Sequence, residues 1–457
     1  MRVAVIGAGV AGLAAGHRLT QQGHNADVYE RWPGLGGQVA TVDIGDGTLL
    51  ERYYHHLFTT DAAIAALYEE LGLEIEWLPS SMGVFSDGRS YAFTSPLDLL
   101  RFTAMSLRGR IRMGLATVLL QRRHKEVEPF ESVTAHDWVR ANMGPEAWDV
   151  LWGPLLRGKY GPRANDISMA WLWSKLTLRR RLEGKEARGE MLGYPRGGFE
   201  PLLERLRESI ETGGGRVLID RPAKAIAAAE GGGFEVTAGA PDSFRRGHDP
   251  REFEEAGPPE RYDAVIATVP SDVFAALVEP SLGERLDPRC MAGTSAIPYQ
   301  TALCVILELD RQFGRFYWTN IVDDSLPFLG LIEQTNLIGP EHYGGRHLLY
   351  IANYLEPSDP LLDLDYDELV DAYTPGLKRV NPEFDKSWIR ERWIFREPAA
   401  QPVVTLGYRE RMPPLDTGAP GLILANTTQI YPEDRGTNYS VELGDRAVAA
   451  LNLRASG

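Results

Sequence analysis

Three glycines near the start of the chain are spaced so that they could hold a phosphate group. Gly7, Gly9 and Gly12 follow the apolar run 3–6, and a stretch of helical character over 13–19 follows them. In such a turn Gly7 allows the tight bend, Gly9 lets the backbone approach a pyrophosphate, and Gly12 lets helix and strand pack closely. The helix N-terminus would then offer free N–H groups and a positive dipole end to the phosphate.

A carboxylate follows at the spacing that nucleotide recognition requires. A second apolar run over 26–29 ends on Glu30, and a dinucleotide-binding unit places the acid that binds a ribose hydroxyl about 20 residues beyond its glycines. Strand, glycine turn, helix, strand and acid together predict a β-α-β unit that binds a dinucleotide. A glycine turn without a nucleotide is the competing interpretation, and this context disfavours it.

A second glycine pair distinguishes the stretch from that of a plain dehydrogenase. Gly36 and Gly37 follow the acid after Arg31-Trp32-Pro33-Gly34-Leu35. The pattern resembles the FAD-binding head of the flavin amine oxidase superfamily, which includes protoporphyrinogen oxidases and phytoene desaturases. Gln38 stands where that family usually has arginine, so the chain departs there from the family's charged contact.

The middle of the chain resembles the second FAD-binding segment of the same superfamily. A Pro-x-Gly-Gly turn precedes an expected helix over 200–211 and an expected strand over 216–220. Residues 223–229 and 234–238 predict a hairpin across three glycines. The resemblance implies that the strand around Ala225 lies against the adenine.

The last segment resembles the part of the superfamily that returns to the cofactor. A strand over 420–426 is followed by a helix that opens at Gly436. The resemblance implies that this helix points its N-terminus at the pyrimidine edge of the flavin, where its dipole would favour negative charge on the reduced ring. Asn426 stands near the family's usual Gly-Asp, so Glu433 or Asp434 is an alternative source of the carboxylate.

The resemblance thus implies a set of cofactor contacts. They are Gly7, Ala8, Gly9, Ala11, Gly12, Glu30, Arg31, Gly36, Gly37, Gln38, Ala225, Asn426, Gly436, Thr437 and Tyr439. No cysteine lies near the last segment, so the expected FAD is bound non-covalently, without the thioether link of some amine oxidases.

Three polar side chains are candidates for catalysis. His55 and His56 lie in the segment that, in the superfamily, runs along the flavin, although a pair of partly buried loop histidines would look the same. Glu333, close to Asn336 at an expected strand end, could face the flavin or could end a solvated strand. No acid-base dyad is recognisable, which suits hydride transfer to a cofactor that carries the difficult step.

The pattern of expected elements indicates an α/β protein. We expect a Rossmann-type FAD-binding domain that is discontinuous in sequence, formed by residues 1–90, 191–275 and 396–457. Residues 91–190 and 276–395 would form a discontinuous α+β substrate domain, with a mixed antiparallel sheet and a helical cap. Residues 241–260, rich in charge, proline and glycine, would be an exposed loop.

A basic amphipathic stretch covers residues 96–131, where apolar side chains alternate with seven arginines or lysines and Asp98 is the only acid before Glu126. It could contact a membrane surface, form an entry lip for an apolar or anionic substrate, or be a solvated helical face.

Further on, Arg157 and Lys159 stand among aromatic residues that include two tryptophans, Trp171 and Trp173. These could line a substrate cavity or form a helix-helix core with solvated cations.

The overall composition excludes several classes of function. A formal net charge of -15 argues against a nucleic-acid-binding role. The two cysteines, Cys290 and Cys304, form no CxxC or Cys/His cluster, so no metal site is expected and the chain looks cytoplasmic. The glycine turn begins at residue 7, leaving no room for a signal peptide, and no apolar run of about 18 residues could span a bilayer.

The resemblance implies an FAD-dependent oxidoreductase of the oxidase or desaturase type, which transfers hydride from a C–H bond of a small-molecule substrate to the flavin, and an apolar compound could be that substrate. The chain has no second glycine fingerprint for NADPH, so oxygen or a quinone is the expected electron acceptor. A flavin-dependent isomerase or mutase acting on a nucleotide sugar is the alternative, with Arg157 and Arg179–Arg181 as diphosphate ligands. A flavin-binding protein without catalysis is a third hypothesis.

Overall fold

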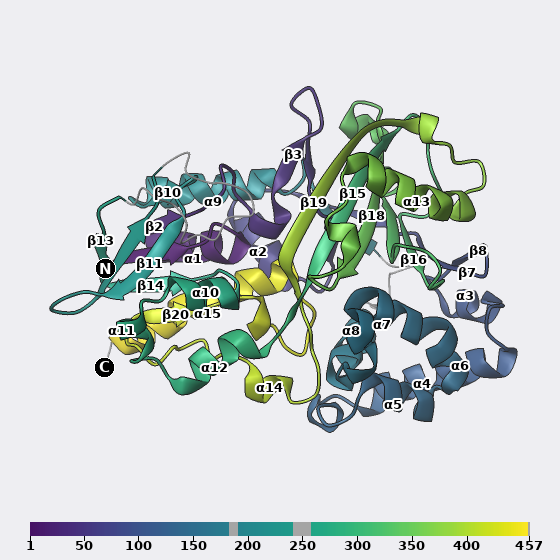
Figure 1. Cartoon of the computed structure of the whole chain (residues 1–457), viewed down its shortest axis with the longest axis horizontal. Coiled ribbons are helices and arrows are strands. Elements are labelled where there is room, and N and C mark those ends of the chain that lie inside the picture. Colours follow the sequence, from purple (N-terminus) through teal and green to yellow (C-terminus); the bar gives the residue numbers. More distant parts are fainter. Residues whose placement is uncertain (182–190, 241–256, 456–457) are drawn as a thin grey trace.

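The structure is a computed structural model that describes residues 1–181, 191–240 and 257–455. A five-stranded parallel sheet with the order β10-β2-β1-β14-β20 is the centre of one half of the molecule (Figure 1). Its strands are β1 (Arg2–Ile6), β2 (Asn25–Tyr29), β10 (Arg216–Leu218), β14 (Ala264–Ala267) and β20 (Leu422–Leu424). The α/β prediction is confirmed, and so is the β-α-β unit at its start.

Both faces of this sheet are covered, which explains why its strands are apolar without alternation. Val3 and Val5 pack with buried side chains of helices α1 (Val10–Gln21), α9 (Glu200–Thr212) and α15 (Thr437–Ala455). Ala4 and Ile6 join a second core under the hairpin sheet and helix α10 (Ser271–Leu277). The hairpin sheet consists of β11 (Ala223–Ala228), β12 (Phe234–Ala238) and β13 (Glu260–Tyr262).

A seven-stranded mixed sheet dominates the other half, with the order β19-β15-β18-β17-β16-β7-β8. Its strands are β7 (Met82–Ser86), β8 (Arg89–Ala92), β15 (Tyr299–Leu309), β16 (Trp318–Ile321), β17 (Gly330–Glu333), β18 (His347–Leu355) and β19 (Ile389–Pro402). Val305 and Leu307 pack under helix α13 (Tyr366–Val380). Ile306 and Tyr350, in contrast, are part of the same hydrophobic core as strand β1 of the parallel sheet. One continuous core therefore joins the two halves.

A group of helices lies beneath the seven-stranded sheet in Figure 1, at the end of the molecule away from both termini. It consists of α3 (Pro96–Arg101), α4 (Leu107–Arg123), α5 (Ala135–Asn142), α6 (Pro145–Ala147), α7 (Gly153–Tyr160) and α8 (Met169–Arg181). Phe102, Met113, Trp148 and Trp171 are buried in its core. Within the described residues, no helix is long and apolar enough to cross a membrane.

Shorter elements complete the chain. They are β3 (Thr41–Asp43), β4 (Leu49–Glu51), β5 (Leu57–Phe58), β6 (Ile75–Pro79), β9 (Met191–Pro195), α2 (Ala62–Glu70), α11 (Pro280–Gly283), α12 (Pro288–Ala296) and α14 (Tyr408–Arg411). β5, β9 and β6 form a small antiparallel sheet.

Two strands cross the domain boundaries that the sequence suggested. β7 and β8 pair with the seven-stranded sheet, so the boundary expected at residue 90 falls inside β8. β19 runs through the boundary expected at residue 395. The hairpin over 223–238 forms as predicted. Of the loop expected at 241–260, residues 241–256 lie outside the described residues.

Candidate functional site

A long cavity runs along the carboxyl edge of the five-stranded sheet, where nucleotides bind in open α/β sheets. Gly7 follows β1, Glu30 follows β2, Thr268 follows β14, and Ala425 follows β20, and all four residues line the cavity. The far wall comes from β19, through Phe395, Glu397 and neighbouring residues. The cavity thus lies between the two halves of the molecule.

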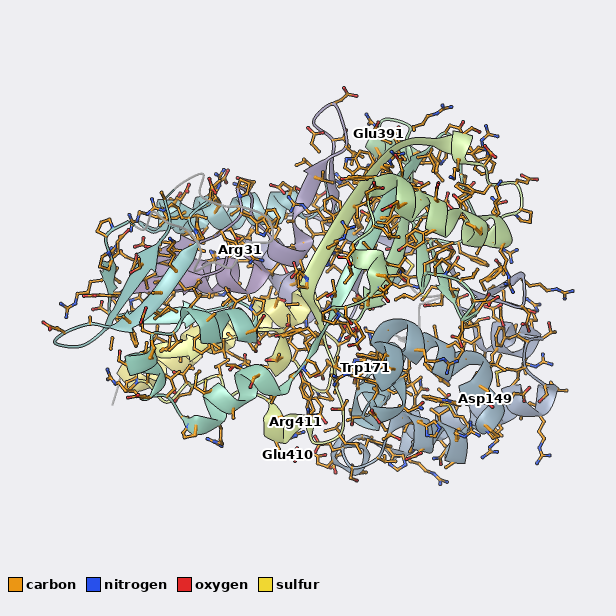
Figure 2. The ribbon with its side chains drawn as sticks, in the orientation of Figure 1. Arg31, Asp149, Trp171, Glu391, Glu410 and Arg411 are labelled. Atoms are coloured by element: carbon orange, nitrogen blue, oxygen red, sulfur yellow. The ribbon has the colours of Figure 1, made fainter. Side chains whose placement is uncertain are left out.

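Most of the residues expected at a cofactor meet in this cavity. Gly7, Gly9, Ala11, Glu30, Arg31, Gly36, Gly37, Gln38, His55, Asn426, Gly436 and Thr437 line it. Figure 2 shows Arg31 in the half of the molecule that contains the parallel sheet. These residues come from four separate segments of the chain, and three of these segments follow strands β1, β2 and β20 of the parallel sheet.

The glycine turn leaves space on one side and is closed on the other. A Cβ added to Gly9 would have the Gly36 carbonyl oxygen, at 3.9 Å, as its nearest contact, so the Gly9 backbone is open to a ligand. A Cβ on Gly12 would lie 1.9 Å from the carbonyl oxygen of Gly7. Gly12 therefore serves helix packing and does not line the cavity, whereas Gly9 is the open part of the cradle.

Glu30 connects the turn to the end of β2. Its Oε2 accepts a hydrogen bond from the Ala8 amide at 2.8 Å, and its Oε1 accepts one from the Trp32 amide at 3.0 Å. Burial raises the pKa of Glu30, while the two amides act in the opposite direction. A carboxylate has about four acceptor positions, so lone pairs remain for the hydroxyls of a ribose. Ala8 donates this hydrogen bond to Glu30 through its amide, and it does not line the cavity.

Two further expected contacts lie outside the cavity for geometric reasons. At Ala225 the register of the hairpin shifts, and Pro222 and Ala223 line the cavity instead. Tyr439 is not on the helix face that Thr437, Ser440 and Leu443 present to the cavity at three-residue spacing.

Gln38 and Asn426, the two residues that depart from the family pattern, both line the cavity. Gln38 donates from its amide to the Ala399 carbonyl at 3.1 Å, which ties the second glycine pair to β19. The Asn426 side chain accepts from the Thr428 amide at 3.1 Å and donates to the Val269 carbonyl at 3.0 Å. Asn426 therefore lines the cavity through a fixed loop and supplies no charge.

The two histidines face different surroundings. His55 lines the cavity, and its Nδ1 lies 2.6 Å from the Tyr53 carbonyl oxygen. A carbonyl can only accept, so Nδ1 carries the proton, and burial lowers the pKa of His55 to about 4. His55 is thus neutral near pH 7, with Nε2 as an acceptor. His56 is bonded to the Tyr317 hydroxyl at 3.0 Å and does not line the cavity.

Glu333 also lies away from the cavity. It is 2% exposed, and its two carboxylate oxygens accept from the amides of Phe313 at 2.7 Å and Gly314 at 2.6 Å. Burial raises the pKa of Glu333 to about 7. Glu333 therefore fastens the 313–314 loop to the end of β17. Asn336 holds the same loop by donating a hydrogen bond to the Gly314 carbonyl.

A cluster of cations adjoins the cavity at the start of α15. Arg435 lines the cavity, and the next residue back, Asp434, lies 2.7 Å from Lys159 Nζ and 2.5 Å from Lys175 Nζ. The lysines pull the pKa of Asp434 far below its ordinary value despite burial, and burial lowers the pKa of Lys159. We call Lys159, Lys175, Asp434 and Arg435 the cationic cluster.

Aromatic rings and unpaired polar atoms surround the cationic cluster. Lys159 Nζ lies 5.0 Å from the centre of the Trp171 ring and 5.5 Å from that of Tyr354. Arg435 donates to the Tyr354 hydroxyl. The Tyr160 hydroxyl, the Arg435 Nε and the Gln300 Oε1 are buried without a partner among the described residues. Figure 2 shows Trp171 where the helical group meets the rest of the molecule.

The other residues of the aromatic loop have structural roles. Arg157 pairs with Asp324 at 2.6 Å on the surface, and Trp173 Nε1 donates to the His124 carbonyl at 3.2 Å. For these two, the interpretation as a packed core with a solvated cation fits the structure. The side chains of Arg179–Arg181 lie outside the described part of the chain.

Sequence reasoning missed part of the cavity wall. Thr268 and Glu397 line it from segments without a glycine motif, and Arg435 and Tyr53 line it beside the predicted Gly436 and His55. Thr268 could have been found from its place directly after a buried parallel strand, because the carboxyl ends of such strands meet at one edge. Glu397 could not, since only the pairing of β19 with β15 brings it there.

Comparisons with known proteins agree with this geometry. The family model described as flavin containing amine oxidoreductase matches residues 10–451. The chain is 28% identical over 242 residues to a 15-cis-phytoene desaturase of Synechococcus elongatus, covering 49% of this chain and 50% of that one. It is 28% identical over 173 residues to a mitochondrial protoporphyrinogen oxidase of Nicotiana tabacum, covering 37% and 34%. The aligned parts span half or less of these relatives' length.

The fold is shared with solved structures. One is a reduced UDP-galactopyranose mutase with a TM-score of 0.73 and 17% identity, covering 99% of this chain and 96% of that chain. At this identity the likeness concerns the fold alone. The family match, in contrast, extends over nearly the whole sequence, and the chain belongs to the flavin-containing amine oxidoreductase family.

Proposed function

We propose that the chain is an FAD-dependent oxidoreductase of the oxidase or desaturase type. The observation that carries this proposal is the cavity at the carboxyl edge of the parallel sheet, which combines the open Gly9 cradle, Glu30 and the N-terminus of α15. When bound there, FAD would supply a flavin N5 that accepts a hydride from a substrate C–H bond.

The residues present fit a dinucleotide. The open Gly9 backbone and the N-terminus of α1 would face the pyrophosphate, and Glu30 has lone pairs left for a ribose. Pro222, Ala223 and Leu277 extend the cavity with apolar surface that suits an adenine. We infer non-covalent binding, because neither cysteine lines the cavity and both are buried: Cys290 is 0% and Cys304 2% exposed.

The other end of the cavity favours negative charge. Gly436 caps α15, because its carbonyl accepts from the Ser440 amide, so the first amides of the helix point toward the cavity. Arg435 adds a full positive charge beside this helix end. Such an arrangement would stabilise negative charge on a reduced ring and so make hydride acceptance easier.

The substrate site would adjoin the cationic cluster. Lys159, Lys175 and Arg435 face one carboxylate, Asp434, and the Arg435 Nε and Tyr160 hydroxyl still lack partners among the described residues. An anionic or strongly polar group of the substrate would pair with the cations of this cluster, while Tyr354 and Trp171 would cover an apolar part. We therefore infer a small molecule with an apolar body and a polar or anionic end.

His55 would position the substrate or the cofactor and not transfer a proton as an acid. It is neutral near pH 7 and presents Nε2 as an acceptor. Among the described residues that line the cavity, the other candidate bases are Glu30 and Glu397, of which Glu30 is tied to two amides. Hydride transfer without a strong base fits these surroundings, and oxygen or a quinone would reoxidise the enzyme.

The test is anaerobic reduction of the FAD-loaded protein by candidate substrates. Polycyclic, polyene and amine compounds, each with and without a carboxylate, are added and loss of the flavin absorption is followed. Bleaching by one class, reversed by oxygen or a quinone, is the expected result. Flavin that no compound bleaches, and that only dithionite reduces, would contradict the oxidoreductase proposal.

The second candidate is a flavin-dependent mutase on a nucleotide sugar, which the cationic cluster favours because three cations would also suit a diphosphate. In that case the dithionite-reduced protein would interconvert a sugar nucleotide with no net consumption of an oxidant. Turnover with an electron acceptor and turnover without one separate the two proposals.

A further inference from the structure

An apolar surface lies on the helical group, separate from the residues that line the cavity. Leu107, Ile111, Leu115 and Leu119 follow one another at four-residue spacing along α4, and their exposed fractions are 57%, 47%, 60% and 46%. Residues at this spacing lie on one face of a helix. Val118 beside them, and Leu97 and Leu100 on α3, are also exposed, at 41%, 61% and 46%. We call these seven side chains the α3–α4 face.

This concentration is not a general property of the surface. In the part of the chain that the structure describes, the other large apolar side chains with comparable exposure are scattered over separate elements. They are Met1, Leu49, Trp77, Ile219, Tyr366 and Leu406. Single exposed apolar residues are ordinary, but a contiguous patch of this kind marks an interaction site.

The α3–α4 face is bordered by positive charge in a chain whose net charge is -15. Exposed basic side chains flank it along the same two helices, namely Arg101, Arg108, Arg112, Arg122 and Arg123. Asp98 is the only acid between residues 97 and 123, and its carboxylate caps α3 through the Ser95 amide at 2.9 Å. The patch therefore combines an apolar stripe with a basic border.

The buried side of α4 explains why the exposed apolar residues are not needed for folding. Met113 and Leu120 are buried in the helical core, at 4% and 1% exposure. The opposite, exposed face contains Leu107, Ile111 and Leu115, which line a shallow groove between α4 and α5 with Arg108 and Trp138. A helix with apolar residues on both faces therefore leaves one apolar face open to a second partner.

We propose that the α3–α4 face binds the surface of an anionic lipid bilayer, with α4 lying in the plane of the headgroups. Leu107, Ile111 and Leu115 would enter the acyl boundary, while the flanking arginines contact anionic headgroups. A symmetric pairing of two copies through this face would bring two basic borders together, which disfavours a second copy as the occupant.

The experiment is co-sedimentation of the folded chain, residues 1–457, with vesicles of phosphatidylcholine alone and with vesicles in which a third of the lipid is phosphatidylglycerol. We expect binding to the anionic vesicles that falls as salt is raised. The triple variant Leu107→Gln, Ile111→Gln and Leu115→Gln should bind at least tenfold more weakly. The variant Arg108→Gln, Arg122→Gln and Arg123→Gln should lose the preference for anionic lipid.

A matched control uses exposed apolar residues elsewhere. Leu49→Gln with Leu406→Gln, whose parent side chains are 38% and 40% exposed, should bind as the wild type does. The proposal would be overturned if the wild type bound neither kind of vesicle, or if the control variant lost as much vesicle binding as the triple Leu/Ile variant. A wild-type dimer that the triple Leu/Ile variant converts to a monomer would also overturn it, because a second copy would then cover the face. Circular dichroism confirms that each variant is folded.

Discussion

The amide of Ala8, inside the glycine turn, donates a 2.8 Å hydrogen bond to the carboxylate of Glu30 at the end of the neighbouring strand. One carboxylate thus fixes the phosphate-facing turn relative to the position proposed for a ribose. The two most specific parts of the sequence pattern are joined by a direct contact, so they form a single unit.

Replacement of Glu30 by glutamine should weaken FAD binding. The glutamine side chain would keep the size of the original but offer one acceptor oxygen in place of two. The Ala8 amide and a ribose hydroxyl would then compete for that single acceptor. Loss of a charged hydrogen bond costs about 1.5–3 kcal/mol, or roughly 10- to 150-fold in affinity. Quenching of flavin fluorescence on titration measures the change. Glu69→Gln, at an exposed position on α2, is the control, and an equal loss in both variants would contradict the role of Glu30.

Two glycines of the turn should respond in opposite ways to alanine. Gly9→Ala adds a methyl group with no atom closer than 3.9 Å, so the fold should keep its stability to within about 1 kcal/mol while FAD binding falls. Gly12→Ala puts the methyl group 1.9 Å from the Gly7 carbonyl oxygen and should destabilise the fold itself. Denaturant unfolding without FAD, together with FAD titration, separates the two effects. Equal loss of stability in both variants would be evidence against Gly9 as an open cradle.

The predicted cofactor residues that line the cavity are mostly those that a local sequence pattern singled out. The glycines, the acid and the second glycine pair lie within one short stretch, so their spacing alone predicts contacts to a nucleotide. The strand and helix around Gly436 are likewise consecutive. Ala225, predicted to lie against the adenine, does not line the cavity. The hairpin register shifts between Ala223 and Ala225, which no local pattern reveals, and Ala223 lines the cavity.

The cationic cluster could be only half predicted. Lys159 was visible as a cation among aromatic residues, but its partner Asp434 lies 275 residues further along the chain. Nothing in either segment indicates the other, because the packing of the helical group against the loop before α15 creates the pair. Glu333, at the end of a strand, fastens a neighbouring loop through two amides. The sequence alone cannot distinguish such a residue from a catalytic acid.

Lys159→Met should affect substrate more than cofactor. Asp434 keeps Lys175 as a partner at 2.5 Å, so the loop should stay in place, while an anionic end of the substrate loses a cation. We expect KM to rise by about tenfold, in line with loss of one charge-assisted contact, with FAD affinity unchanged. Steady-state kinetics with the substrate found by anaerobic bleaching gives KM and kcat.

Arg157→Gln on the same helix is the matched control for Lys159, because Arg157 pairs with Asp324 on the surface. It should leave KM unchanged. A Lys159→Met enzyme with unaltered KM, or one that loses FAD, would show that the cationic cluster does not bind substrate.

Glu333 should make the stability of the fold depend on pH. Its pKa rises from 4.5 to about 7 in the folded state, so the folded protein holds a proton that the unfolded chain has already released. The stabilising contribution is present below pH 4.5 and is lost as the pH rises to 7, by roughly 3 kcal/mol. Denaturant unfolding at a series of pH values should therefore give a wild type that loses stability relative to Glu333→Gln over this interval. Parallel curves for the two proteins would contradict the shift.

The most direct test of the account is the cofactor content of the purified protein after loading with FAD. We expect a flavin absorption spectrum, about one flavin per chain, and full release on denaturation of a flavin that chromatography identifies as FAD. A folded protein that takes up no flavin, or one whose flavin stays attached to the denatured chain, would contradict the non-covalent FAD site proposed for the cavity.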